Sequence, residues 1–309
     1  EARELAVRLV AAGGRHVDES QPMVDARLSG GIRVHAVLAP VATPAPLLSI
    51  RLPAPRSPGL DELESAGGLG PGVRKRLEGL VAARANLLIT GAAGSGKTTL
   101  LGALMALAPP GERIVVIEDV AEARIAHPHV VGLEARQPNL EGAGGVDLAR
   151  LLREALRMRP DRLVLGECRG AEIRELLSAM NTGHDGGAGT LHASSLDDVP
   201  ARLEALGALA GLGVVEVARQ AVSAIGAVVH LERDGGRRRV AAIGRPRHEG
   251  GHGFTHAATL ASRAIARAGR IPSCGRLPRS ASCGRVLVPC CGCPSTRLRL
   301  AQRAPRSGR

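Results

Sequence analysis

Residues 91–98 read GAAGSGKT, which fits the pattern G-x-x-x-x-G-K-[ST] of a phosphate-binding loop. Glycines at the fixed positions let consecutive backbone N–H groups turn inward around phosphate oxygens. In such a loop Lys97 reaches the β- and γ-phosphates and Thr98 offers its hydroxyl to Mg²⁺. The chain has only two lysines, Lys75 and Lys97, which argues against a chance match. The predicted nucleotide contacts are Gly91, Ala92, Ala93, Gly94, Ser95, Gly96, Lys97, Thr98 and Thr99.

The sequence on both sides of the loop alternates between strand and helix patterns. An apolar strand precedes the loop and a helix follows it, which places the positive end of that helix at the phosphates. Strands are expected at 85–91, 113–119, 161–167 and 189–193, and helices at 97–107, 146–158, 171–180 and 197–206. This alternation predicts an α/β fold in which helices cover both faces of a parallel sheet.

Four segments are expected along the chain. Residues 1–51 combine an amphipathic helix pattern with two alternating stretches joined at Gly30-Gly31, as in a hairpin, and predict part of an α+β domain. Residues 52–73 are rich in Pro and Gly and predict a linker. The nucleotide-binding domain is expected over 74–244, where a final hairpin turns at 234–236 and regular structure stops at about Gly244. Because the sequence starts at Glu1 without Met, we interpret its N-terminus as incomplete.

The last segment, 245–309, differs in composition from the rest of the chain. It holds 13 arginines, one acid and five of the six cysteines, whereas 1–244 holds 28 basic and 28 acidic residues, so the net charge of +12 belongs to this tail. Its cysteines lack the paired spacing of a zinc site. We interpret the tail as a low-order extension and hypothesise a shifted reading frame near Gly244.

Cys168 is the single cysteine of 1–244, which fits a reducing cytosol. The longest uncharged run, 34–50, contains three prolines and is too short to span a membrane.

Acidic residues follow two of the predicted strands. Glu118 and Asp119 follow one strand, and Glu167 ends another. Nucleotide hydrolysis needs carboxylates of this kind to hold the magnesium shell and to orient water. Two such strand ends downstream of a phosphate loop favour a hydrolase over a passive binder. Glu122 is a further candidate, for which a plain surface role is equally compatible.

Two histidines bracket a glycine-rich run in NTGHDGGAGTLHASS, residues 181–195. His184 and His192 lack the third ligand and the helical spacing of a metal site. Ser194 and Ser195 fit the start of a helix better than a nucleophile. The residues alone leave two interpretations open, a buried histidine that is merely hydrogen-bonded and a sensor of the γ-phosphate.

The run from Leu156 to Leu206, together with the phosphate loop, resembles the type II/IV secretion ATPase superfamily. The resemblance covers about 1–244, with four motifs in the expected order, and is strongest to the TadA/CpaF branch that powers Flp/Tad pilus assembly, including actinobacterial members associated with conjugal transfer. GAAGSGKTT matches the Walker A loop, IEDVAEARIAHPHVVGLEARQPN the Asp box, RLVLGECRG the Walker B motif, and NTGHDGGAGTLHASS the His box.

The resemblance implies a role for individual residues. Glu118, with Glu122 as the second candidate, activates the attacking water, and Glu167 joins Lys97 and Thr98 around the Mg²⁺ of bound ATP. His192 contacts the γ-phosphate region, supported by His184. Arg51 matches an arginine of the N-terminal domain at the domain interface, while Arg136 and Arg169 lie in matching motifs with less defined roles. Val120 replaces a threonine common in relatives, and the Arg- and Cys-rich tail has no counterpart there.

The resemblance also implies an activity and a setting. It describes a RecA-like ATPase that works as a homo-oligomeric ring, a hexamer, in the cytoplasm at the inner face of the membrane. Hydrolysis would move one domain on the other and drive inner-membrane platform proteins of a secretion or pilus system. The alternatives are a RecA-like nucleic-acid motor and a nucleotide-binding assembly factor without turnover. Residues 1–244 are formally neutral and contain no Phe, Tyr or Trp, so no direct nucleic-acid partner is expected.

Overall fold

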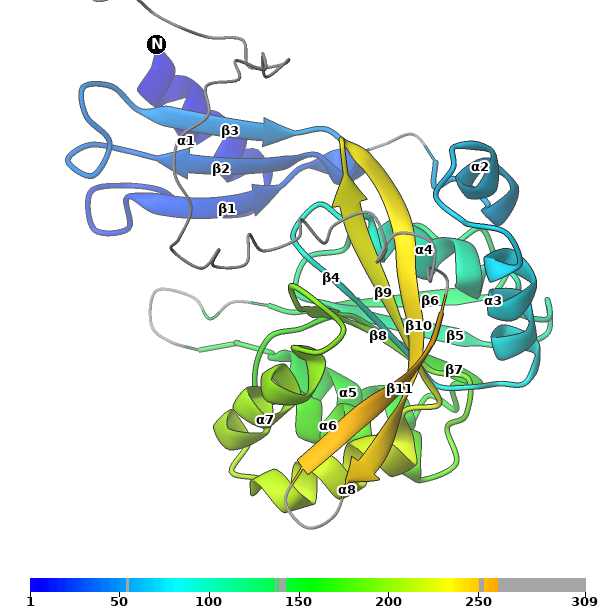
Figure 1. Ribbon diagram of the computed structural model, residues 1–309. Helices are drawn as coiled ribbons and strands as arrows, with labels where there is room; N and C mark the ends of the chain where they lie inside the picture. Colours follow the sequence, from blue (N-terminus) through cyan, green and yellow to red (C-terminus); the bar gives the residue numbers. More distant parts are fainter. Residues whose placement is uncertain (54–55, 137, 139–142, 250–252, 261–309) are drawn as a thin grey trace, which may run out of the picture. The chain divides into compact units, whose positions relative to one another are not determined.

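Figure 1 shows the computed structural model, which describes residues 1–53, 56–136, 138, 143–249 and 253–260. Side chains are described as far as residue 247. All of these residues belong to one compact unit, Glu1–Arg267. They form two separate sheets, one of three strands and one of eight.

The small sheet has the order β1-β2-β3 and is antiparallel throughout. Its strands are β1 (Met23–Arg27), β2 (Arg33–Val37) and β3 (Leu47–Arg51), with the short helix η1 (Ser29–Gly31) between the first two. Alternating residues of β1 and β2 point inward and pack with Ala6 and Val10 of helix α1 (Ala2–Ala12). The hairpin expected at Gly30-Gly31 is therefore present, and Gly30 has the positive φ of 74° that its turn needs.

The large sheet has the strand order β11-β10-β9-β4-β8-β7-β5-β6. The strands from β9 to β6 are mutually parallel, and β10 and β11 add an antiparallel edge. Their bounds are β4 (Leu87–Gly91), β5 (Ile114–Glu118), β6 (Val130–Glu134), β7 (Arg162–Cys168), β8 (Ala188–His192), β9 (Ala227–Asp234), β10 (Arg237–Glu249) and β11 (Gly253–Leu260). The predicted α/β class with a parallel-rich sheet is thus confirmed.

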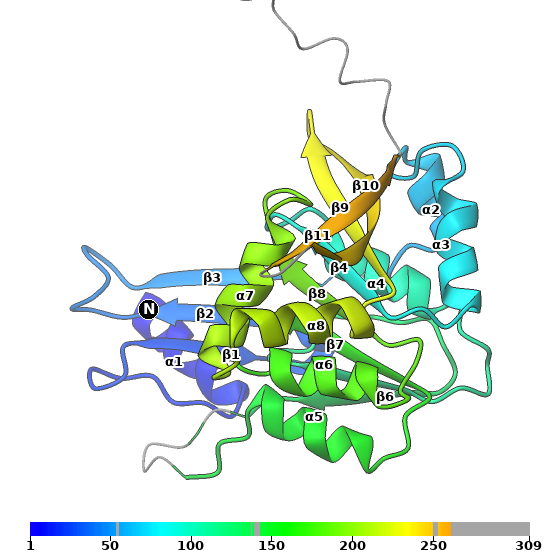
Figure 2. The same cartoon turned by 60° about the horizontal axis from the view of Figure 1, so that its bottom comes forward.

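Helices cover both faces of this sheet, because the side chains of a strand alternate between the faces. Leu87 and Ile89 of β4 face α2 (Leu60–Ser65), α3 (Val73–Ala82) and α4 (Lys97–Met105). Leu88 faces the opposite layer of α5 (Leu148–Leu156), α6 (Ile173–Asn181), α7 (Val199–Leu209) and α8 (Val214–Ala224). Figure 2 shows this second layer from the front. The central strands are buried on both faces, as their continuous apolar sequences require.

Two features differ from the sequence-based expectations. Regular structure does not stop at Gly244, because β10 continues to Glu249 and pairs with β11 from Ala242 onward. The Pro- and Gly-rich segment 52–73 contains α2, and its Leu60 and Leu69 are buried in the core of the large sheet. In the part of the chain that the structure describes, no single helix is long and apolar enough to cross a membrane, and only α7 with α8, bent by 118°, meets those criteria as a pair.

Candidate active site

The phosphate loop connects β4 to α4 and contains three glycines, Gly91, Gly94 and Gly96, in conformations that other residues rarely adopt. Gly91 has φ of 149°, and a Cβ there would lie 2.5 Å from Leu231 O and 2.6 Å from Ser95 Oγ. Gly96, with φ of 99°, directly precedes the first residue of α4. The first-turn N–H groups of α4 therefore point back into the loop, which is the arrangement that binds phosphate.

Lys97, His192 and Glu167 form a continuous line of polar contacts beside the loop. The Lys97 ammonium donates to Gly91 O and Ala92 O at 3.0 Å, and its Nζ lies 3.3 Å from His192 Nδ1. His192 Nε2 in turn lies 2.7 Å from Glu167 Oε1. Because an ammonium can only donate, Nδ1 is the acceptor and Nε2 carries the ring proton; Nε2 is close to Glu167 Oε1, although this oxygen accepts no hydrogen bond. His192 thus bridges the lysine of the loop and the acid at the end of β7.

Burial and neighbouring charges set the protonation of these three groups. Burial lowers the pKa of Lys97, although the Glu167 carboxylate opposes that shift. Burial, and then the Lys97 ammonium, lowers the pKa of His192 from its usual value of 6.5, so the ring is neutral at pH 7. Burial would raise the pKa of Glu167, but its hydrogen bond from Arg169 and the charges of Arg169, His192 and Lys97 hold it below its usual value. Glu167 is therefore ionised.

Glu118 occupies a different environment at the end of the neighbouring strand. Its side chain is 6% exposed, and its Oε1 accepts the backbone N–H groups of Glu122 and Ala123 at 3.0 and 2.9 Å. Burial raises the pKa of this carboxyl group even though the two N–H bonds oppose the shift. Gly166 of β7 leaves room for it, since a Cβ at that position would lie 2.5 Å from Glu118 Cγ. A fixed carboxylate with a raised pKa is suited to accept a proton.

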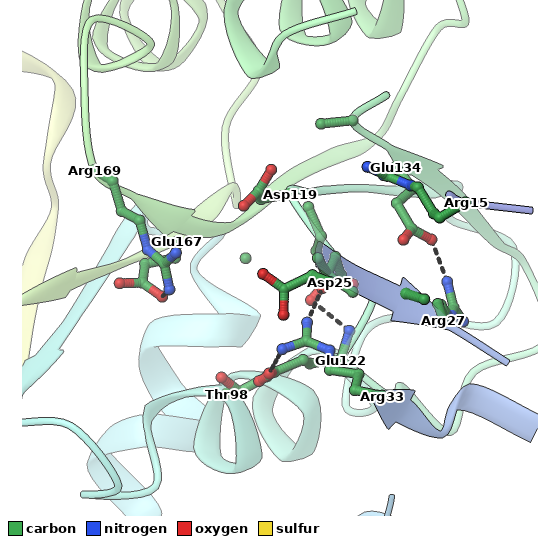
Figure 3. A pocket seen from close by; sticks show the side chains of 15 residues that line it. Arg15, Asp25, Arg27, Arg33, Thr98, Asp119, Glu122, Glu134, Glu167 and Arg169 are labelled. Carbon is green, nitrogen blue, oxygen red and sulfur yellow. Dashed lines mark hydrogen bonds and ion pairs between the residues drawn. The ribbon is translucent and has the colours of Figure 1, made fainter. Parts of the chain in front are cut away.

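Glu122 is held by arginines of the small sheet. Its Oε1 lies 2.5 Å from Arg33 Nη1 and 2.9 Å from Arg51 Nη1. Arg33 Nη2 also donates to Val120 O at 2.8 Å, and Arg27 pairs with Glu134 at the end of β6. Figure 3 shows Arg27, Arg33, Glu122 and Glu134 around a pocket of about 210 Å³ that is also lined by Thr98, Glu118, Asp119 and Glu167. We call this pocket the phosphate pocket.

The phosphate pocket borders the phosphate loop at Thr98 and offers oxygen ligands of the kind that Mg²⁺ takes when it is bound with phosphate. Mg²⁺ prefers oxygen ligands and usually takes only one or two side chains, the remainder being water and phosphate. Thr98, Asp119 and Glu167 bring a hydroxyl and two carboxylates to the phosphate pocket. Among the described residues, no group of three or more His, Cys, Asp or Glu could hold a metal ion by itself. Thr98 and Glu167 are accordingly the groups that would face a nucleotide-bound Mg²⁺.

The structure brings most of the sequence-predicted site residues to one edge of the sheet, but it places His184 elsewhere. His192 pairs with Gly91 in the β4–β8 register, whereas His184 precedes β8 at the other end of that strand. A five-residue strand spans about 13 Å, so His184 does not reach the phosphate loop. Its Nδ1 is buried without a hydrogen-bond partner, while the residue as a whole is half-buried. Arg136 is exposed and bridges to Val146 through its backbone.

Sequence reasoning missed Arg27 and Arg33. The register of the small sheet pairs Arg33 with Arg27 on one side and with Arg51 on the other, so three arginines form one row across the strands. Like charges directly opposite one another destabilise a sheet unless acids offset them. Glu122 and Glu134 supply that offset. The signal was present in the hairpin, because counting three residues from Gly30 in each direction aligns Arg27 with Arg33.

Comparison with known proteins identifies the family of the chain. The chain belongs to the type II/IV secretion system protein family, whose model matches residues 2–270. A putative conjugal transfer protein of Mycobacterium tuberculosis is 49% identical over 248 residues, which is 78% of this chain and 70% of that protein. The conjugal transfer protein TrbB of Rhizobium radiobacter is 36% identical over 228 residues, which is 72% of this chain and 67% of that protein.

Solved structures agree on the fold. The pilus retraction motor PilT with bound ADP superposes with a TM-score of 0.52 at 21% identity, covering 81% of this chain and 66% of that one. The ATPase DotB of Legionella pneumophila gives a TM-score of 0.51 at 24% identity, covering 69% of this chain and 57% of that one. The family model and the relatives confirm the expected membership of the type II/IV secretion superfamily, and the solved structures agree on its fold.

Proposed function

We propose that the chain hydrolyses ATP with Mg²⁺ and is the motor of a type II/IV secretion or Flp/Tad pilus-assembly system. It would work as a hexameric ring of identical subunits in the cytoplasm, at the inner face of the membrane, against inner-membrane platform proteins. The observation that carries this proposal is the contact line from Lys97 through His192 to Glu167, with Glu118 on the adjacent strand. Family membership and the relatives' names support the secretion setting.

Each step follows from groups of the chain. Lys97 and the loop N–H groups bind the β- and γ-phosphates, and Mg²⁺, when bound with ATP, neutralises developing charge on the phosphate oxygens. Glu118 takes the proton of a water molecule whose oxygen attacks the γ-phosphorus, while the bond from that phosphorus to the β-phosphate oxygen breaks. The raised pKa of Glu118 and its two backbone N–H bonds suit a positioned base.

His192 would report whether the γ-phosphate is present. A γ-phosphate oxygen competes with His192 Nδ1 for the Lys97 ammonium, so a bound γ-phosphate would release the ring from Lys97. Loss of phosphate reverses the exchange. Arg33 and Arg51 of the small sheet form ion pairs with Glu122, which lies in the loop that follows Glu118. A shift of that loop would therefore move the small sheet as well. This route would convert hydrolysis into movement of the N-terminal sheet.

Phosphate release from ATP tests the proposal. We expect Lys97→Ala to abolish both ATP binding and hydrolysis, and Glu118→Gln to abolish hydrolysis while ATP still binds. Glu122→Gln is the matched control and should retain turnover, because Glu122 is tied to Arg33 and Arg51 rather than poised as a base. Full activity in Lys97→Ala would refute the proposal, and an unaffected Glu118→Gln would favour an assembly factor. Strong stimulation by single-stranded DNA would favour the nucleic-acid motor.

A further inference from the structure

Strand β7 contains a bulge at the point where it reaches the phosphate pocket. Its register with β8 shifts between Leu165 and Cys168. Gly166 and Glu167 therefore lie opposite a single residue of β8, Thr190. The pairing of β7 with β5 also ends at Leu165. A bulge of this kind inserts one extra residue into a strand and re-aims the side chains that follow, and bulges are over-represented next to active sites.

The bulge decides which face of the sheet Glu167 occupies. Leu163 and Leu165 pack in the core layer of α5 to α8, and strict alternation along β7 would point Glu167 into the same layer. Cys168 takes that place instead and is 2% exposed, whereas Glu167 lines the phosphate pocket. Without the extra residue in β7, the carboxylate would be buried among apolar side chains and the thiol would face the opposite layer.

Thr190 is the side chain that contacts the bulge from β8. It is 1% exposed, and its hydroxyl donates to Gly166 O at 2.6 Å. Ala188 of the same strand packs in the layer of α4, and alternation puts Thr190 on that face as well. Because a bulge disrupts the hydrogen-bond ladder locally, a side-chain donor at this point fixes a carbonyl that lies outside the regular pairing.

Gly166 also approaches the other acid of the candidate site. Strand β7 lies between β5 and β8, and a Cβ on Gly166 would lie 2.5 Å from Glu118 Cγ. Gly166 is thus enclosed by the side chain of Glu118 on one strand and the hydroxyl of Thr190 on the other. We propose that Thr190 is a positioning residue, whose hydroxyl fixes the bulge and thereby turns Glu167 out of the core and into the phosphate pocket.

The Mg²⁺ dependence of ATP hydrolysis by the full chain tests this inference, which rests on the proposed function. Thr190→Val removes the hydroxyl and keeps the shape of the side chain, whereas Thr190→Ser keeps the hydroxyl. We expect Thr190→Val to raise the Mg²⁺ concentration at half-maximal rate by about tenfold, as loss of a residue that orients a metal ligand does. Thr190→Ser should restore the parent value. An unchanged Mg²⁺ dependence in Thr190→Val, or no rescue by serine, overturns the inference.

Binding of a fluorescent ADP in the absence of Mg²⁺ separates positioning of Glu167 from general damage to the site. The phosphate loop is unaltered in each variant, so this affinity should equal that of the parent chain. A loss of ADP binding that matches the loss of activity in Thr190→Val would mean that the substitution acts on the whole site, and it would overturn the role given to Thr190.

The reactivity of Cys168 gives a readout that does not depend on hydrolysis. Burial raises the pKa of this thiol, which keeps it unreactive in the folded chain. We expect alkylation of Cys168 by N-ethylmaleimide, followed by mass spectrometry of its peptide, to be about tenfold faster in Thr190→Val, because the strand segment that buries the thiol opens more often. Thr190→Ser should react at the parent rate.

The Cys168 readout also keeps failure of this inference distinct from failure of the proposed function. If the parent chain hydrolyses no ATP, the proposed function fails, and equal protection of Cys168 in Thr190→Val and the parent still overturns the inference. Thr190→Ala removes the same hydroxyl if Thr190→Val does not fold. Ser65→Ala is the control for loss of a hydroxyl, because Ser65 donates to Asp61 O on the exposed surface of α2 and should leave both readouts unchanged.

Discussion

His192 is the residue whose protonation state the candidate site depends on most directly. Its pKa lies below 6.5 because the ring is partly buried and faces the Lys97 ammonium. Acid therefore adds a second positive charge beside Lys97 and removes the acceptor at Nδ1. The stability of the fold changes with pH in the same direction. The unfolded chain binds the His192 proton more readily than the folded chain, so the free energy of unfolding falls as pH decreases from 6.5 through the lowered pKa of His192.

We predict that the pH profile of kcat carries an acid limb below pH 6.5 to which His192 contributes. Glu118 also loses its charge in acid, so the limb of the parent chain reports both groups. A glutamine can accept from Lys97 and donate to Glu167 without titrating. His192→Gln should therefore keep measurable activity and shift its acid limb to lower pH. The measurement is kcat for ATP from pH 5 to 8; an unshifted limb in the variant contradicts the role given to His192.

Among the elements, β4 is anchored at its start by a buried amide. Asn86, which is 6% exposed, donates to Met180 O and Ala224 O and accepts from the N–H of Gly187. Its side chain thereby ties β4 to the ends of α6 and α8 and to the turn before β8. Buried backbone groups that lose their partner each cost about 1–3 kcal/mol, so the anchor stabilises several elements at once.

We predict that Asn86→Ala lowers the free energy of unfolding by about 3 kcal/mol or more, because three backbone groups lose their partner. The kcat for ATP should stay within about twofold in the folded variant, since Asn86 lies at the opposite end of β4 from the phosphate loop. Urea unfolding measures the first effect. Asn181→Ala is the matched control, because Asn181 is exposed and makes one bond, to Gln220 O. Equal stability of the two variants would show that the anchor is unimportant.

The elements also show what the sequence can predict. The strands around the phosphate loop are continuous apolar runs, and each was expected within a few residues of its observed bounds. β6 was missed because it is an edge strand whose side chains alternate between exposed and half-buried positions, which weakens its apolar pattern. The predicted position of His184 beside the phosphate loop was wrong for a similar reason. Spacing in the sequence puts it eight residues from His192, and only strand pairing shows that β8 lies between them.

At the scale of the whole molecule, the position at which the ordered sheet ends has a measurable consequence. β10 pairs with β9 over Arg237–Gly244 and with β11 from Ala242 to Glu249, so the backbone of β10 is hydrogen-bonded well beyond Gly244. β11 in turn lies beside α7 and α8. A chain cut after Gly244 would lose β11 and leave β10 as an unpaired edge, which favours aggregation. A chain cut after Leu260 would keep every described strand.

We therefore predict that a chain ending at Leu260 melts within about 2 °C of the full chain, since it loses no described contact, whereas one ending at Gly244 melts several degrees lower.

Ending at Leu260 also removes 11 arginines and no acid, so the shortened chain should bind nucleic acid less strongly and with a weaker dependence on salt. The phosphate pocket lies on the opposite side of β4 from β11 in the strand order, so the rate of ATP hydrolysis should be the same in the full chain and in the chain ending at Leu260. Thermal melting, DNA binding at two salt concentrations and phosphate release test these points. Equal melting of the two shortened chains would mean that the β10–β11 ladder contributes nothing to the fold.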